Sequence, residues 1–311
     1  MKRFFLLTLA SAALLGASAA PVKTYEVKSP DGRLALVLTA GERLSFTVAR
    51  DGETLVAPSE MALTLSTGEV LGESPRVRSA RRRAVTETID APLYRQSRFD
   101  AAYNELDLRL RGDYGILARA YDDGVCYRFY TERDGELTIV DETAQLNFEG
   151  DPSAYIPYSK TEIPMRTSFE NTYEYAPLSK FRTQTVAFMP VLVDLGERGY
   201  VLYTESDVEA YPGVYLTYDK EAKGFAARFA ECPTETSLTK RFQDVVERSA
   251  DYIARVDGRR SYPWRIVAYA ATATELPVND MVWQTAEASR VADASWVRDG
   301  KIAWDWWNNW G

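Results

Sequence analysis

The sequence predicts a mainly β protein, in which antiparallel sheets of more than a dozen strands pack face to face as a sandwich. Three observations carry this prediction. Apolar and polar side chains alternate along short segments. Turn motifs recur roughly every 8–12 residues, as is typical of antiparallel sandwiches and barrels. From residue 22 to about 275 no convincing helical pattern interrupts the series, which disfavours a parallel α/β sheet.

The expected strands can be followed from the N-terminal end. The turn Ser29-Pro30-Asp31-Gly32 separates the first two, and Asp122-Asp123-Gly124 leads into a later one. Within them, apolar residues such as Leu34, Leu36 and Leu38 recur at every second position, so that they share one face. In chain order, the clearest expected strands are 22–28, 33–39, 44–48, 106–110 and 125–131.

Residues 1–19 have the features of a secretory signal peptide. Lys2 and Arg3 form a basic start, residues 4–15 are almost wholly apolar, and Ala17-Ser18-Ala19 fits a small-residue cleavage site. The apolar run is shorter than the ~20 residues that a membrane span needs. We therefore expect cleavage near residue 20, no membrane span in the mature chain, and a periplasmic or extracellular location.

The charge balance argues against nucleic acid as a partner. The chain has 37 basic and 45 acidic side chains, and removal of the signal peptide makes the balance more negative. An acidic surface repels a phosphate backbone. The one basic run, Arg81-Arg82-Arg83, is short, and we interpret it as a solvated strand edge.

The absence of histidine limits the chemistry that the chain can perform. It excludes Ser-His-Asp and Cys-His catalysis and histidine-ligated zinc within this chain. Carboxylates, Tyr, Lys and backbone groups remain for any chemistry, and oxygen ligation of calcium remains open. Of the two cysteines, Cys126 lies in an apolar stretch, so we expect a buried free thiol there. Whether Cys126 and Cys232 are bonded is left open, because two cysteines in so long a chain are no disulfide framework.

The composition changes near Pro277. Asn279 is a candidate cap for a short helix over residues 280–287. All seven Trp residues lie at or after Trp264, and residues 301–311 form an apolar, aromatic segment at which the sequence stops. We interpret this ending as the start of a barrel strand in a truncated reading frame.

At this C-terminal stretch the sequence resembles glycoside hydrolase family 97, the exported α-glucosidases and α-galactosidases. The residues that carry the resemblance are 289–297, Ser-Arg-Val-Ala-Asp-Ala-Ser-Trp-Val, and 300–308, Gly-Lys-Ile-Ala-Trp-Asp-Trp-Trp-Asn. The segment 118–129 is similar to a strand–turn–strand of the family's N-terminal domains. The resemblance covers essentially the whole mature chain.

The resemblance implies a domain organisation. It predicts a galactose-mutarotase-like β-super-sandwich over 20–275, a short helical linker over 276–300, and the first strand of a (β/α)8 barrel over 301–311. The family's catalytic carboxylates lie on later barrel strands, so no catalytic residue is assigned here, and we expect this chain alone to be inactive. Retaining or inverting chemistry and glucoside or galactoside specificity stay open.

The Trp-rich end supplies the candidate substrate contacts. Aromatic rings stack on the C–H faces of sugars, carboxylates and amides bind hydroxyls, and barrel strands present their C-terminal ends to the active site. Because one face of a barrel strand packs under helices, about half of these side chains are expected to be structural. The candidates are Trp304, Asp305, Trp307 and Asn308.

A second candidate is the polar, aromatic loop 166–175, which breaks the strand rhythm. In the α-glucosidase branch of the family, a Glu of the N-terminal domain is one ligand of a calcium ion, and the resemblance places Glu170 at that position, with Glu174 as second choice. Calcium accepts such oxygen ligands in irregular geometry. The alternative is an ordinary sandwich loop whose acids are solvated.

Three functions follow from these observations. The first is a truncated glycoside hydrolase acting on α-glucosides or α-galactosides of oligosaccharides or polysaccharides, for which this chain provides the scaffold and a sugar-binding wall. The second is a stand-alone carbohydrate-binding β-sandwich without catalysis. The third is a structural or adhesive surface domain. A strand that ends inside an expected barrel favours the first.

Overall fold

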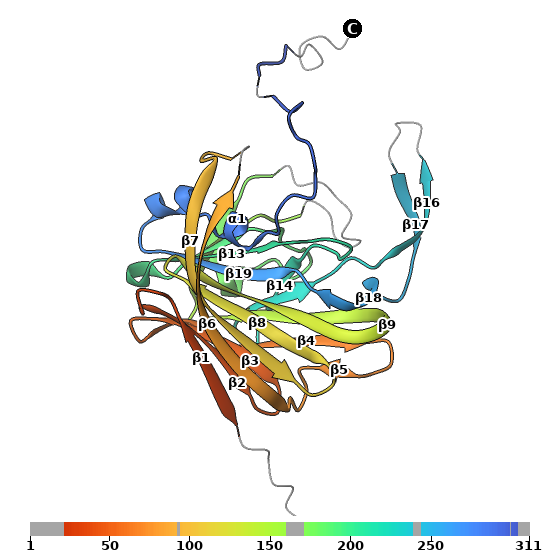
Figure 1. Cartoon of the computed structure of the whole chain (residues 1–311), viewed down its shortest axis with the longest axis horizontal. Helices are drawn as coiled ribbons and strands as arrows, with labels where there is room; N and C mark the ends of the chain where they lie inside the picture. Colours follow the sequence, from red (N-terminus) through yellow and green to blue (C-terminus); the bar gives the residue numbers. More distant parts are fainter. Residues whose placement is uncertain (1–21, 92–93, 160–170, 239–243, 299, 304–311) are drawn as a thin grey trace, which may run out of the picture.

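The computed structural model describes residues 22–91, 94–159, 171–238, 244–298 and 300–303 (Figure 1). The expectation of a mainly β fold is confirmed: all sheet pairings between the named strands are antiparallel, and within these described ranges helix is confined to four short segments. These are η1 (Leu178–Lys180), η2 (Gly196–Arg198), η3 (Ala273–Val278) and α1 (Met281–Thr285). Across the ranges described, no helix has the length and apolar character that a bilayer crossing requires.

The strands form two layers, of which the first carries the residues discussed below. Its strands follow the hydrogen-bonded order β6, β7, β8, β9, β19, β13, β12, β10, β11, while β18 also pairs with β9. Their bounds are β6 (Val77–Asp90), β7 (Arg98–Leu110), β8 (Tyr114–Tyr121), β9 (Gly124–Asn147), β10 (Ser153–Ile156), β11 (Glu174–Pro177), β12 (Val191–Asp194), β13 (Tyr200–Ser206), β18 (Ala254–Ser261) and β19 (Trp264–Ala270).

The second layer shares strand β9 with the first. The first half of β9 pairs with β8, and its second half pairs with β4 and β15. The short β5 (Val70–Leu71) pairs with the end of β4. The strands of the second layer are β1 (Lys23–Lys28), β2 (Leu34–Ala40), β3 (Leu44–Arg50), β4 (Glu53–Leu65), β14 (Tyr215–Asp219) and β15 (Gly224–Arg228).

The hydrophobic core fills the space between the layers. The leucines expected on one face of residues 33–39 are fully buried, and so are their counterparts on β8 and β9, as the period of two requires. This core consists largely of Leu, Val, Ile, Phe and Tyr from both layers.

One charged cluster is buried within this core. Arg265 is 1% exposed and donates to both oxygens of Glu142 at 2.8 Å, and to Glu205 Oε2 at 2.6 Å. Arg265 alternates along β19 with Trp264 and Ile266, so it points to the inner face while they point to the outer face. A buried guanidinium needs such a pair of carboxylates, because an unpaired charge there would be costly.

Several sequence expectations can be compared with the strands. Each of the five expected segments falls in a strand, apart from the first residue of two of them, and Cys126 is a buried free thiol, as expected; Cys232 is also free. The basic run 81–83 lies in β6, which pairs with β7 alone among the described strands. The predicted loop 166–175 extends too far, because Glu174 and Tyr175 pair with β10 as part of β11.

The chain leaves the sandwich through a short helix, as expected. The cap position was wrong by one residue: Asp280 is the residue before the first helical turn, while Asn279 Oδ1 accepts from the Met281 amide at 3.2 Å. Beyond α1 the chain runs away from the sheets, and the hairpin of β16 (Pro233–Leu238) and β17 (Asp244–Ser249) also projects from the body (Figure 1).

Candidate functional site

The outer face of the first layer holds the segment that leads out of the sandwich. Met281 of α1 is fully buried against this face, in a small apolar cluster with Tyr103, Tyr121 and Trp264. A side chain at position 124 would prevent this contact, since a Cβ on Gly124 would lie 2.0 Å from Met281 Sδ. The Asp-Asp-Gly turn predicted from the sequence therefore ends in a glycine that makes room for α1.

Polar contacts fix both ends of α1. At its start, Arg95 Nη2 donates to both carboxylate oxygens of Asp280 at 2.7 Å, and Tyr94 Oη donates to the same carboxylate at 2.7 Å. At its end, the hydroxyl of Thr285 lies 2.7 Å from that of Ser206, on β13. The helix is thus fixed at its start by the connection between β6 and β7 and at its end by β13.

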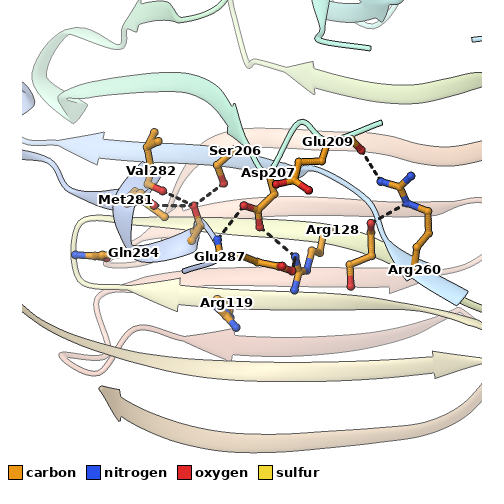
Figure 2. Close-up of polar contacts among 12 residues, drawn as sticks. Arg119, Arg128, Ser206, Asp207, Glu209, Arg260, Met281, Val282, Gln284 and Glu287 are labelled. Carbon is orange, nitrogen blue, oxygen red and sulfur yellow. Dashed lines mark hydrogen bonds and ion pairs between the residues drawn. The ribbon is translucent and has the colours of Figure 1, made fainter. Parts of the chain in front are cut away.

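A cluster of charged residues lies just beyond α1, and we call Arg128, Asp207 and Glu287 the linker cluster (Figure 2). Asp207 Oδ1 accepts from the Glu287 amide at 2.9 Å, and Arg128 Nη1 lies 3.4 Å from Asp207 Oδ2 and 3.7 Å from Glu287 Oε1. Burial raises the pKa of Asp207, while the Glu287 amide and Arg128 oppose that rise. The cluster joins β9, the end of β13 and the outgoing chain.

Two further contacts extend this cluster along the outgoing chain. Arg260 Nη2 donates to the carbonyl oxygen of Glu209 at 2.9 Å (Figure 2). The carboxylate of Glu209 in turn forms an ion pair with Arg290. Residues 287–290 are therefore tied to the segment that follows β13.

Two arginines flank the indole of Trp264 on the outer face. The guanidinium carbons of Arg119 and Arg128 lie 4.8 and 4.4 Å from its ring centroid, and Arg119 also lies over Tyr103 at 4.5 Å. Glu105, which is 3% exposed, accepts from Arg119 Nε at 2.9 Å. Burial, together with the charge of Arg119, lowers the pKa of Arg128. Cation–π contact compensates part of this cost.

The structure brings these residues together but leaves the predicted sugar and metal contacts untested. Trp304, Asp305, Trp307, Asn308 and Glu170 lie outside the described residues.

The second-choice ligand, Glu174, is described. It lies in β11 and forms an ion pair with Arg182. Among the residues that the structure describes, no three His, Cys, Asp or Glu side chains are grouped so that they could hold a metal ion. These residues alone therefore do not form a calcium site.

Exposed tyrosines surround the described end of the predicted loop. Tyr155, Tyr173 and Tyr175 are 39%, 42% and 53% exposed, and the rings of Tyr155 and Tyr175 lie 4.6 Å apart. Tyr175 Oη donates to Asp194 Oδ2 at 2.9 Å, which fixes the orientation of its ring. Exposed aromatic rings with a polar tip are frequent at binding surfaces.

The linker cluster was missed by sequence reasoning. Asp207 and Glu287 are 80 positions apart, and neither belongs to a recognisable motif. The one local signal is Arg128, a charge that interrupts the otherwise apolar expected strand 125–131.

Comparison with known proteins identifies the family to which this architecture belongs. The profile of the glycosyl-hydrolase 97 N-terminal family matches residues 27–287. The chain belongs to glycoside hydrolase family 97. The match covers the sandwich, α1 and the linker cluster, and it confirms the resemblance seen in the sequence.

Two curated relatives belong to the same group of enzymes. The family 97 chain is 36% identical to a retaining alpha-galactosidase of Bacteroides thetaiotaomicron over 296 residues, which is 93% of this chain and 45% of that protein. It is 29% identical to a probable retaining alpha-galactosidase of Streptomyces bingchenggensis, over 89% of this chain and 39% of that protein. The chain thus spans less than half the length of these relatives.

Solved structures share the fold. A glycoside hydrolase family 97 enzyme from Pseudoalteromonas sp. strain K8, in complex with acarbose, superposes with a TM-score of 0.73 at 16% identity, over 88% of this chain and 40% of that one. A beta-arabinopyranosidase superposes with a TM-score of 0.64 at 18% identity, over 80% of this chain and 40% of that one.

Proposed function

We propose that this chain is the N-terminal part of a glycoside hydrolase that cleaves α-galactosides with retention of configuration. The observation that carries the proposal is the 36% identity to the retaining alpha-galactosidase over 93% of the chain. Among the two specificities that the sequence left open, this similarity favours galactosides over glucosides.

Within such an enzyme the sandwich acts as a scaffold. Retaining hydrolysis needs two carboxyl groups about 5–5.5 Å apart, held on either side of the scissile bond. We assign the linker cluster a structural role, because Asp207 accepts from the Glu287 amide and Arg128 lies near both carboxylates, so that these contacts fix the outgoing chain. Its contribution is to set where the chain leaves the sandwich, and so where a following domain begins.

A chimera tests this proposal. Residues 27–287 replace the matching region of the Bacteroides enzyme, and the product is assayed with an aryl α-galactoside and an aryl α-glucoside. We expect galactosidase activity from the chimera, with the α-anomer released first as seen by proton NMR, and no turnover by the 311-residue chain alone. A folded chimera without galactosidase activity would contradict the scaffold role, because the barrel of the Bacteroides enzyme already supplies the catalytic carboxylates.

A stand-alone carbohydrate-binding module is the second candidate, and the exposed tyrosines at positions 155, 173 and 175 favour it. Affinity electrophoresis of the 311-residue chain in a gel containing galactomannan discriminates between the two. Retardation by this polysaccharide that disappears in Tyr175→Ala would support a binding module, while unchanged migration supports the scaffold.

Export of the chain and a calcium ion complete the proposal. The basic, apolar and small-residue pattern of residues 1–19 supports export, and N-terminal sequencing of the secreted protein should start near residue 20.

For calcium, we propose that Glu170 provides one ligand, with the others supplied from outside the described residues. In the chimera, Glu170→Gln should weaken the calcium dependence of activity, whereas Glu174→Gln should not. The reverse result would exchange the two assignments, and no change in either would make the loop structural.

A further inference from the structure

A groove crosses the outer face of the first layer, away from α1. Its volume is about 670 Å³, and strands β6 to β9 and β18 contribute its walls. The side chains used below are Arg81, Asp107, Arg109, Tyr130, Glu132 and Arg260. The proposed function does not use this groove, and the inference drawn here does not depend on it.

Tyr130 forms a rigid aromatic surface in the groove. Its hydroxyl donates to Asp107 Oδ1 at 2.6 Å. Its ring covers Gly115 on the neighbouring strand β8, where a Cβ would lie 2.3 Å from Tyr130 Cζ. The glycine therefore provides the space in which the tyrosine lies. A ring that is already fixed loses little conformational freedom when a ligand stacks on it.

Polar groups next to this ring can both accept and donate hydrogen bonds. Arg109 Nε lies 3.3 Å from Asp107 Oδ2, and Arg109 Nη2 lies 3.3 Å from Glu132 Oε1. Alternating carboxylates and guanidinium groups beside an aromatic surface suit a ligand with many hydroxyls, because each hydroxyl both donates and accepts.

The charge of the groove is positive, although the whole chain has a formal charge of −8. Five arginines line it, against three carboxylates. Arg260 donates only to the carbonyl oxygens of Ser261 and Glu209, so no carboxylate neutralises it among the described residues. Arg81 likewise has no ion pair with any described residue, although it stands opposite Asp107 on the neighbouring strand. The groove thus has room for an additional negative charge.

We propose that this groove binds a saccharide that carries a carboxylate, such as a chain of uronic acid units. A sugar ring stacks on Tyr130, its hydroxyls bind Asp107 and Glu132, and its carboxylate lies near Arg81 and Arg260. A polyphosphate ligand fits less well, because it offers no apolar face to the tyrosine and meets the three carboxylates of the groove.

Binding to the purified 311-residue chain tests the proposal without any enzymatic assay. Isothermal titration calorimetry with trigalacturonate and, in parallel, with neutral galactotriose should show binding of the acidic sugar at least about tenfold tighter. Equal affinity for the two sugars, or no binding of trigalacturonate, would overturn it. Failure of the galactosidase proposal would leave these affinities unchanged, so the two are separable.

Variants then locate the site. Tyr130→Ala should weaken trigalacturonate binding about tenfold or more, while Tyr130→Phe, which keeps the ring, should stay close to the unaltered chain. Arg81→Gln should reduce the preference for the acidic sugar. Arg98→Gln on β7, outside the groove, is the matched control. Circular dichroism checks that each variant is folded. Unchanged binding in folded Tyr130→Ala would place the sugar elsewhere and refute the proposal.

Discussion

Arg265 on the inner face and Arg128 on the outer face of the first layer differ in how closely carboxylates contact them. On the inner face, Arg265 is 1% exposed and three short hydrogen bonds to two carboxylates satisfy it. On the outer face, Arg128 lies 3.4 Å or more from its carboxylates, and its Nε has no hydrogen-bond partner within the described ranges. Trp264 and Arg265 are adjacent in the chain, yet one belongs to each face.

This difference separates a structural charge from one that remains available. The inner cluster is closed around Arg265, which is 1% exposed and makes three short hydrogen bonds to Glu142 and Glu205. The outer face has incomplete contacts beside the outgoing chain and in the groove of Tyr130. In this sheet, arginines with few carboxylate contacts therefore lie on the outer face, which contacts the outgoing chain and contains the groove.

The largest effect on stability is expected from a substitution that breaks the inner cluster. Arg265→Met leaves Glu142 and Glu205 buried without their cation, so we expect a loss of about 3–5 kcal/mol in the free energy of unfolding. Urea unfolding followed by fluorescence measures it.

The outer-face counterpart, Arg128→Met, is the comparison. It removes longer contacts and one cation–π contact, and should cost about 1–2 kcal/mol. Equal losses in the two variants would mean that the faces do not differ as described.

An effect smaller than that of Arg265→Met is expected where α1 contacts the outer face. In Gly124→Ala the new methyl group meets Met281 and the backbone of Ala268, and relieving this overlap should cost about 1–3 kcal/mol. Gly41→Ala is a suitable control, since its Cβ would make only ordinary contacts, 3.6 Å or more from its neighbours. Thermal unfolding distinguishes them, and equal midpoints would indicate that α1 does not need the space at position 124.

The pH dependence of stability provides a third test, at Asp123, the residue before Gly124. Burial raises the pKa of Asp123 from 3.8 to about 6. The folded chain therefore holds this proton more tightly than the unfolded chain, and stability falls as the pH rises between about 4 and 6. We expect a decrease of roughly 1–2 kcal/mol over this window, absent in Asp123→Asn. A decrease that persists in the variant would belong to another group.

The smallest effect is expected at an exposed pair on the far end of the layer. Arg98 and Asp90 form an ion pair at 2.8 Å, with both side chains about 70% exposed. Such pairs contribute little, because solvent screens them. Arg98→Gln should leave the unfolding midpoint unchanged within error. A clear shift would mean that exposed ion pairs of this layer matter outside the linker cluster and the groove as well.

The strands were predictable because their signal is local. Alternation identified the five expected segments, and the Asp-Asp-Gly turn placed the start of β9. The length of β9 was not predicted, since only 125–131 showed the pattern clearly while the strand continues to Asn147. Its second half changes partners from β8 to β4, and nothing in the local sequence reports that change.

The sites were less predictable for the opposite reason. Arg95 and Asp280 are 185 positions apart, and the groove collects side chains from five strands. Contacts of this kind depend on how strands are ordered in the sheet, which spacing along the chain does not contain. The predicted contacts at 304–308 and at Glu170 rest on the family resemblance and remain predictions.

Strand β9 also determines how the molecule comes apart. Its 24 residues supply hydrogen-bonding partners to β8, β18 and β19 in one layer and to β4 and β15 in the other. Because both layers pair with β9, one layer cannot separate from the other without breaking hydrogen bonds to this shared strand. The sandwich should therefore melt in a single cooperative transition, with the amide protons of β9 among the last to exchange with solvent.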